Sequence, residues 1–295
     1  MSNPNTITAW IDWAQQHFAD AELYFGHGTD DSISETIYLL AYALNTDFDL
    51  SGFEKDTPLS TEQNENIHSL LRSRVEKKIP AAYLVNEAWF CGLPFYVDDT
   101  VLIPRSPIAE LIESEFQPWI KRQNIHSILE IGTGSGCIAL SCAYYLQDVT
   151  VDAVDVDEHA ISIANKNTQN LELESRVNII KSDVFSAITT KKYDIIVSNP
   201  PYVSVQEYDA LPAEYKHEPE IGLKSGDDGL DCVRIILSEA ADYLNDDGIL
   251  IVEVGNSQTN LESAFPDIPF MWLDFEFGGS GVFLLEKVQL NKYFK

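Results

Sequence analysis

Short apolar segments alternate with helical ones from residue 125 onward, and this alternation restricts the fold more than any other feature. Five apolar runs are predicted as strands, at residues 125–130, 149–155, 177–181, 193–198 and 248–255. Helices are expected between them at 137–146, around Ile161 and Ala164, and at 233–244. Apolar strands separated by helices form a parallel sheet covered on both faces. We therefore predict an α/β, Rossmann-like fold, with its first five strands in the order 3-2-1-4-5.

The end of the chain predicts a hairpin. Residues 270–275 and 281–286 are apolar, and Gly278-Gly279-Ser280 lies between them. Gly-rich segments of this kind join neighbouring antiparallel strands. The hairpin would complete a mostly parallel seven-stranded sheet with one antiparallel strand.

The first 85 or so residues have helical periodicity instead. One stripe comprises Ile7, Trp10, Ile11, Ala14 and Phe18. Such spacing places the side chains on one helix face, and core packing explains it best. Ser32 with Glu35, and Ser60 with Gln63, predict capping boxes that open a second and a third helix.

Four basic residues cluster near the end of the third helix: Arg72, Arg74, Lys77 and Lys78. They form either a small contact patch or a solvated face. We favour the solvated face, because cations near a helix C-terminus are stabilised by the helix dipole.

A connector separates the two regions. Trp89-Phe90-Cys91 and Phe95-Tyr96-Val97 flank Gly92-Leu93-Pro94, a pattern typical of a hairpin. A helix is expected to follow near Ile108. The chain is thus divided into a helical domain at 1–87, a β-hairpin connector at 88–106 and an α/β domain at 107–295.

The charge excludes several classes of protein. Lys and Arg number 19 against 47 Asp and Glu, so the formal net charge is −28. A dedicated nucleic-acid binder needs a cationic face, whereas an acidic chain attracts basic partners. We expect no stable nucleic-acid binding.

The sequence also predicts a cytoplasmic protein. No apolar run reaches the roughly 18 residues of a membrane span, and the N-terminus lacks the pattern of a secretory signal. The four cysteines, Cys91, Cys137, Cys142 and Cys232, are scattered and form no CxxC pair. We therefore expect reduced thiols, no metal site and no membrane contact.

A glycine loop follows the first predicted strand, with Gly132, Thr133, Gly134 and Gly136 after Glu130. Glycines at alternate positions let the backbone turn sharply and approach a ligand closely. Taken alone this pattern is weak, because dinucleotide enzymes use similar turns.

Three acidic residues sharpen the interpretation. Glu130 precedes the loop, where a carboxylate disfavours a pyrophosphate and suits a ligand ammonium group. Asp155 ends the second strand, where it could accept hydrogen bonds from a ribose diol, and Asp183 follows the third, where it could accept from an adenine amino group. Each aspartate alone could be a strand-end cap. Together they favour a ligand with an amino-acid head, a ribose and an adenine, which describes S-adenosylmethionine.

The sequence Asn199-Pro200-Pro201-Tyr202 follows the fourth strand. A proline holds the preceding residue extended, and prolines have no N–H. The turn therefore presents two acceptors, the Asn199 side-chain oxygen and the Pro200 carbonyl, which suit an NH₂ group on a planar carbon. Tyr202 could lie over that group. Held in this way, an amide or nucleobase nitrogen could attack a sulfonium methyl in line. The alternative is a plain Pro-Pro turn.

These two motifs resemble those of class I S-adenosylmethionine-dependent methyltransferases that modify planar amino groups. Nearly the whole chain resembles the HemK/PrmC group of protein-glutamine methyltransferases. The group's release-factor branch carries Pro-Arg-Pro-Glu-Thr-Glu after the connector. This chain has Pro104-Arg105-Ser106-Pro107 there, and with Ala88-Trp89-Phe90-Cys91-Gly92 it is similar to the PrmB branch, which methylates a glutamine of ribosomal protein L three.

The resemblance implies roles for individual residues. Gly132, Thr133, Gly134 and Gly136 would wrap the methionine moiety, with Glu130 beside it. Asp155 would hold the ribose, and Asp183 and Val184 would border the adenine. The family often has Trp at the position of Val184, so a ring contact to adenine comes from Phe185 or is absent. Asn199, Pro200, Pro201 and Tyr202 would hold the substrate amide, and Asn199 would also border the cofactor.

The resemblance also implies domain roles and a product, S-adenosylhomocysteine. The helical domain at 1–87 would recognise the substrate and the domain at 107–295 would be catalytic. Arg105 could position the connector or bind a substrate carbonyl. The alternatives are the same chemistry on peptide chain release factors, an amino methyltransferase acting on a nucleobase, or a silent binding module with this fold.

The segment 203–228 is long for a connection and strongly acidic, with seven acids against two lysines: Glu207, Asp209, Glu214, Glu218, Glu220, Asp227 and Asp228 against Lys216 and Lys224. Ribosomal proteins are strongly basic. We hypothesise that this rim steers a free basic ribosomal protein to the site before assembly and rejects ribosomes with exposed rRNA. The alternative is general solubility charge.

Overall fold

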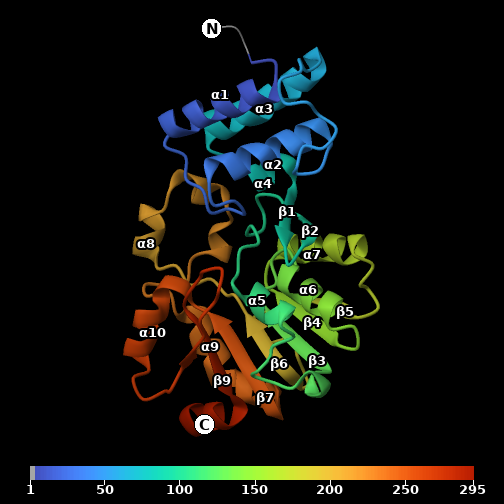
Figure 1. The fold of residues 1–295 in the computed structure, drawn as a ribbon. Coiled ribbons are helices and arrows are strands. Elements are labelled where there is room, and N and C mark those ends of the chain that lie inside the picture. The colour runs from blue at the N-terminus through green and yellow to red at the C-terminus, as the bar shows by residue number, and fades with distance from the viewer. Residues whose placement is uncertain (1–3) are drawn as a thin grey trace. The chain divides into compact units, whose positions relative to one another are not determined.

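A computed structural model describes residues 4–295 and divides them into two compact units (Figure 1). The first unit comprises the chain up to Ala88 together with Pro212–His217. The second comprises Trp89–Leu211 and Glu218–Lys295. Pro212–His217 fall within the predicted 107–295 range, so the segment after the Asn-Pro-Pro-Tyr sequence contributes to the helical unit.

The helical unit is built from α1 (Ile7–Asp20), α2 (Ser32–Leu44), α3 (Thr61–Lys77) and the short α4 (Ala81–Val85). Ile7, Trp10, Ala14 and Phe18 of α1 are buried in its core, and Ile11 packs against them, as the stripe predicts. Ser60 and Gln63 form the predicted capping box of α3.

The capping box predicted for Ser32 and Glu35 is wrong. The N-cap of α2 is Asp31, whose carboxylate accepts hydrogen bonds from the amides of Ile33 and Ser34. Glu35 is 1% exposed and accepts from Arg74 instead. The physical reason is that Asp31 is itself a strong cap, which leaves Glu35 available for a contact distant in the sequence.

The solvated face predicted at the end of α3 is wrong for Arg74. This side chain is 1% exposed, and its Nε donates to Glu35 at 2.6 Å. Its Nη1 donates to Glu214 at 3.1 Å and its Nη2 to the carbonyl of Tyr24 at 2.7 Å. Arg72, in contrast, is exposed and pairs with Glu76 one turn away. Arg74 therefore holds Glu214, from Pro212–His217, inside the helical unit.

The second unit contains the predicted sheet. Its strands are β3 (Ser127–Ile131), β4 (Thr150–Asp155), β5 (Val177–Lys181), β6 (Tyr193–Ser198), β7 (Leu244–Glu253), β8 (Met271–Trp272) and β9 (Val282–Glu286). The order is β5-β4-β3-β6-β7-β9-β8, which confirms the predicted 3-2-1-4-5 arrangement. The first five strands pair in parallel, whereas β9 is antiparallel to β7 and β8. The predicted connector hairpin is also present, as β1 (Glu87–Phe90) and β2 (Leu93–Tyr96).

Helices cover both faces of this sheet (Figure 1). On one face, α5 (Ile108–Glu113) and α6 (Cys137–Tyr145) pack with Ile128 of β3 and Ile195 of β6. On the other, α9 (Asp231–Tyr243), α10 (Gln258–Ala264) and α11 (Lys287–Phe294) pack with the neighbouring Leu129 and Ile196. Successive strand residues thus enter different cores, which explains why the strands read as continuous apolar runs. The remaining α-helices of this unit are α7 (Glu158–Asn170) and α8 (Val205–Ala210).

Candidate functional site

The two predicted motifs begin side by side at the carboxyl ends of β3 and β6. Ile131, the last residue of β3, is in register with Ser198, the last residue of β6. The Ser198 hydroxyl also donates to the Ile131 carbonyl at 2.8 Å. A Cβ placed on Gly132 would lie 3.8 Å from the carbonyl oxygen of Asn199. The chain leaves the sheet here at the point where strand order reverses, which is where ligands bind in such sheets.

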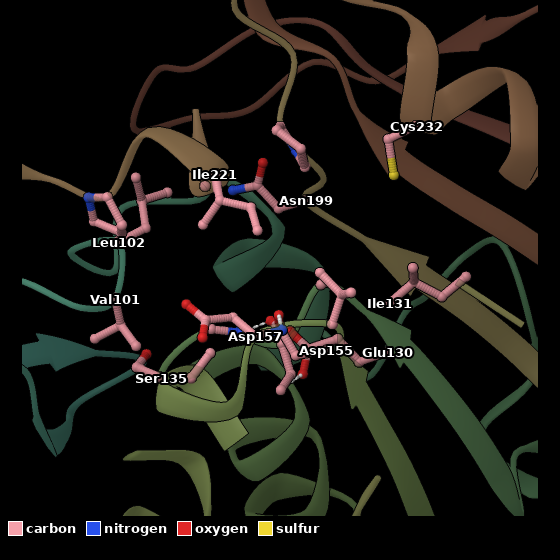
Figure 2. A pocket seen from close by; sticks show the side chains of 18 of the residues that line it. Val101, Leu102, Glu130, Ile131, Ser135, Asp155, Asp157, Asn199, Ile221 and Cys232 are labelled. Atoms are coloured by element: carbon pink, nitrogen blue, oxygen red, sulfur yellow. Dashed lines mark hydrogen bonds between the residues drawn. The ribbon is translucent and has the colours of Figure 1, made fainter. Parts of the chain in front are cut away.

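A cavity of about 350 Å³ lies at this edge, lined by residues of the second unit. Figure 2 shows Glu130, Asp155 and Asp157 gathered on one side of it and Asn199 on the opposite side. Predicted residues that line it are Glu130, Gly132, Thr133, Gly134, Asp155, Asp183, Val184, Asn199, Pro201 and Arg105. The structure therefore brings most of the predicted site together in one cavity.

Gly136, Pro200 and Tyr202 are not among the lining residues. Gly136 has φ +84° and caps α6, and a Cβ there would lie 3.1 Å from Leu140 and 3.4 Å from Ala164. Gly136 therefore lies where two helices pack closely, whereas a Cβ on Gly134 would have open space. Pro200 is buried beside the glycine loop.

Glu130 is 1% exposed at the base of the cavity. Its carboxylate accepts hydrogen bonds from the Thr133 hydroxyl at 2.5 Å and from the amide of Ala139 at 3.0 Å. Burial nevertheless raises the pKa of Glu130 to about 8, because these bonds compensate only in part for lost hydration. The carboxyl can therefore become ionised when a cationic group is placed beside it.

Asp155, the last residue of β4, is held against the glycine loop by backbone hydrogen bonds. Its carboxylate accepts from the amides of Gly134 at 2.8 Å and Asp157 at 3.0 Å. Burial raises the pKa of Asp155 above its ordinary value. Asp183 is exposed and lines the cavity with Val184, whereas Phe185 is stacked on Tyr243 at 4.4 Å in the core. The Phe185 ring thus points into the core and not into the cavity. Of the two alternatives, this favours the one in which no Phe185 ring contacts the adenine.

Asn199 carries the most informative polar atom of the site. Within residues 4–295 its side-chain oxygen is buried and accepts no hydrogen bond. Nearly all buried polar atoms in folded proteins have a partner, so an orphaned acceptor on a residue that lines a cavity indicates a donor on a ligand. The prolines hold Asn199 in place, and the residue lies opposite the acidic side of the cavity (Figure 2).

Sequence reasoning missed two carboxylates at this edge. Glu253, the last residue of β7, accepts hydrogen bonds from Ser106 at 2.6 Å and Tyr202 at 3.2 Å. Glu218 is buried and binds Arg105 through both guanidinium Nη atoms, each at 2.6 Å. An acidic residue that ends the apolar run 248–253 was the available signal for Glu253, because that strand neighbours β6. Glu218 is counted in the acidic segment 203–228, but nothing local in the sequence predicts its pairing with Arg105.

Four of the seven carboxylates in the predicted acidic rim are paired with cations within the protein. Glu214 and Glu218 are buried against Arg74 and Arg105, and Glu220 pairs with Lys224 at 2.8 Å. Asp228 pairs with Arg234 at 2.5 Å. Three of these cations lie outside the segment, but two of them are shared with acids that also lie outside it, Arg74 with Glu35 and Arg234 with Asp231. The local charge excess on which the steering hypothesis depends is therefore reduced only in part.

Among residues 4–295 no group of three or more His, Cys, Asp or Glu side chains could hold a metal ion. The same described residues include no helix that is both long and apolar enough to cross a bilayer. All four cysteines are free thiols.

Comparison with known proteins agrees with this geometry. Residues 116–214 match the family model of the methyltransferase small domain. The catalytic domain of hMettl16, solved with a MAT2A 3′UTR hairpin, is 16% identical with a TM-score of 0.52, over 76% of this chain and 80% of that one. This likeness shows the fold of the class I methyltransferases and nothing more.

Sequence relatives are much closer. The ribosomal protein uL3 glutamine methyltransferase of Francisella tularensis is 42% identical, over 99% of this chain and 94% of that protein. Proteins of the same name from Xanthomonas campestris and Neisseria gonorrhoeae are also 42% identical, covering 96% and 97% of this chain and 91% and 95% of theirs. The chain therefore belongs to the family of ribosomal protein uL3 glutamine methyltransferases.

Proposed function

We propose that this protein transfers a methyl group from S-adenosylmethionine to the side-chain amide nitrogen of a glutamine in ribosomal protein uL3. The observation that carries this proposal is the buried, unpartnered side-chain oxygen of Asn199, a residue that lines the same cavity as Glu130, Asp155 and the glycine loop. The names of the full-length relatives support the choice of substrate.

The residues of the cavity fit the proposed cofactor. Glu130 offers a buried carboxylate for an ammonium group, and Gly134 leaves open space where a side chain would otherwise stand. Asp155 would bind the ribose, and Asp183 and Val184 would border the adenine. When bound, the cofactor supplies an electrophilic methyl group on a positively charged sulfur, and an acidic lining stabilises that charge.

The substrate amide would be held on the opposite side. We infer that the Asn199 side-chain oxygen and the Pro200 carbonyl accept the two amide hydrogens, while Pro201 and Tyr202 pack beside the planar group. These contacts orient the amide nitrogen for in-line attack and stabilise the positive charge that develops on it. Arg105 is held by Glu218, which supports a positioning role for it at the cavity wall.

The whole-chain charge of −28 supports a basic protein substrate that is met before ribosome assembly. We further infer that the helical unit recognises this substrate. Pro212–His217, which follow Asn199 in the sequence, belong to that unit.

The test is methyl transfer to purified candidates at low salt, with mass spectrometry of the products. We expect a 14 Da gain on a single glutamine of isolated uL3 and little transfer to intact large subunits. Asn199→Ala should abolish the gain. Equal methylation of free uL3 and of intact subunits would contradict methylation before ribosome assembly. Transfer only to release factors or to RNA would contradict uL3 as the substrate.

A further inference from the structure

Glu253 is a buried carboxylate that the proposed reaction does not use. It is 5% exposed and lies outside the set of residues that line the cavity. Each of its oxygens accepts a hydroxyl hydrogen bond, Oε2 from Ser106 at 2.6 Å and Oε1 from Tyr202 at 3.2 Å. It therefore joins two segments that flank the cavity, one before α5 and one after β6.

The structure around Tyr202 is shaped to hold its ring. A Cβ on Gly255 would lie 2.7 Å from the Tyr202 ring, so only glycine allows this approach. The Tyr202 carbonyl accepts from the Ser257 hydroxyl at 2.7 Å. Tyr202 is thus fixed by its hydroxyl on Glu253, its ring on Gly255 and its carbonyl on Ser257.

The other partner of Glu253 belongs to the cavity wall. Ser106 lines the cavity and is 6% exposed, and its hydroxyl oxygen also accepts from the amide of Ile108 at the start of α5. The preceding residue, Arg105, is held by Glu218. Arg105 and Ser106 are therefore fixed by two buried carboxylates, Glu218 and Glu253, and Glu253 also reaches the Asn-Pro-Pro-Tyr turn.

We propose that Glu253 is a positioning residue for methyl transfer, which holds Tyr202 and the Ser106 segment at a fixed separation around the substrate amide. This rests on the function proposed above. When the carboxyl is ionised, both of its oxygens are strong acceptors for the two hydroxyls. When it is protonated, one oxygen carries an O–H donor and becomes a weaker acceptor, so one of the two hydrogen bonds must weaken or reverse. Protonation therefore loosens one side of the arrangement.

The electrostatic surroundings give this arrangement a pH dependence. Burial raises the pKa of Glu253 to about 7, and the hydrogen bonds from Ser106 and Tyr202 and the charge of Arg105 act in the opposite direction. Tyr202 is the titratable neighbour and Arg105 the charged one. The turnover rate should accordingly fall as the pH drops below 7.

The kinetic test compares wild type with Glu253→Gln, using isolated uL3 between pH 6 and 9. Misplacement of reacting groups by 1 Å can cost about 100-fold in rate. We expect kcat of the variant to fall between about 10- and 100-fold at pH 8, its acidic limb near pH 7 to disappear, and the Kd for S-adenosylhomocysteine to stay within about threefold. Glu262→Gln removes the same charge from an exposed position of α10 and should behave as wild type. An unchanged kcat and acidic limb in Glu253→Gln would overturn the proposal.

A second pair of variants guards against misfolding of Glu253→Gln. Ser106→Ala and Tyr202→Phe each remove one hydroxyl donor, and their effects on kcat should combine less than additively because both act through Glu253. Strict additivity would count against a shared carboxylate.

A spectroscopic measurement separates this proposal from the proposed function. With ¹³Cζ-labelled tyrosine, the Tyr202 signal is identified by its loss in Tyr202→Phe. It should titrate near pH 7 in wild type and in Glu262→Gln, and remain constant in Glu253→Gln. A constant signal in wild type would overturn the role of Glu253. Absence of transfer to uL3 with a normal titration would instead defeat the proposed function alone.

Discussion

Ile131 and Ser198 are in-register neighbours on adjacent parallel strands, and each is the last residue of its strand. This pairing fixes where the two motifs of the site begin. The glycine loop and Asn199 leave the sheet together, and the cavity forms between them. Because the pairing is continuous over four residue pairs, the two motifs cannot slide past each other without breaking the centre of the sheet.

Cofactor affinity should depend on pH through Glu130. The pKa of Glu130 is raised to about 8 by burial, and a ligand ammonium group favours its ionised form. Binding of S-adenosylhomocysteine should therefore release a proton from the protein, and affinity should rise from pH 6 toward pH 8. Calorimetry in buffers of different ionisation enthalpy measures the released proton. Glu130→Gln keeps an acceptor for Thr133 and Ala139, so it should release fewer protons on binding and show a flatter dependence of affinity on pH. Identical pH profiles in the variant and the wild type would contradict the assignment.

The same carboxyl should make stability depend on pH. The pKa of Glu130 is about 8 in the folded protein against 4.5 in the unfolded chain, so the folded state binds more protons between these values. Its contribution to the free energy of unfolding is complete below pH 4.5 and is lost as the pH rises through 8. The stability of wild type relative to Glu130→Gln, measured by denaturant titration without ligand, should accordingly decline from pH 5 to pH 8.5. A constant difference would refute the raised pKa.

Arg74 should be the critical charge of the helical unit. Replacing it with Met leaves Glu35 and Glu214 buried without their cation, which costs about 3–5 kcal/mol in comparable buried ion pairs. Helical circular dichroism in urea should show the loss. Arg72→Met is the matched control on the same helix, where an exposed pair contributes roughly 0–1 kcal/mol. Equal losses in the two variants would contradict the burial of Arg74.

Gly136 and Gly134 should respond differently to alanine. A Cβ at Gly136 would crowd Leu140 and Ala164 and occupy φ +84°, so Gly136→Ala should lower stability by about 1–3 kcal/mol. At Gly134 a Cβ meets open space in the cavity, although φ is +54°. Gly134→Ala should therefore weaken cofactor binding more than it weakens the fold. Thermal unfolding measures the loss of stability, and ligand titration measures the loss of cofactor affinity. A larger loss of stability in Gly134→Ala and a larger loss of affinity in Gly136→Ala would contradict these assignments.

Most of the sheet and the centre of the site were predictable because their determinants are local. Apolar runs define β3 to β7, and the residues just after two of these strands fix the glycine loop and Asn199 beside each other. Sequence order alone then places both motifs at one edge, since parallel strands share a carboxyl end.

The remaining features depend on partners distant in the sequence. Arg74 pairs with Glu214, 140 residues away, and Arg105 with Glu218, 113 residues away. No periodicity relates such residues, so a basic cluster was interpreted as solvated and an acidic loop as a charged rim. The N-cap of α2 differs for another reason, because Asp31 and Ser32 are both good caps and the local sequence does not choose between them.

The most direct measurement of the central claim is a crystal structure of this protein with S-adenosylhomocysteine and a glutamine peptide from uL3. We expect the ligand amino group beside Glu130, the ribose at Asp155 and the glutamine amide donating to the side-chain oxygen of Asn199. A cofactor bound away from the glycine loop, or an amide that leaves the Asn199 oxygen without a partner, would contradict the account.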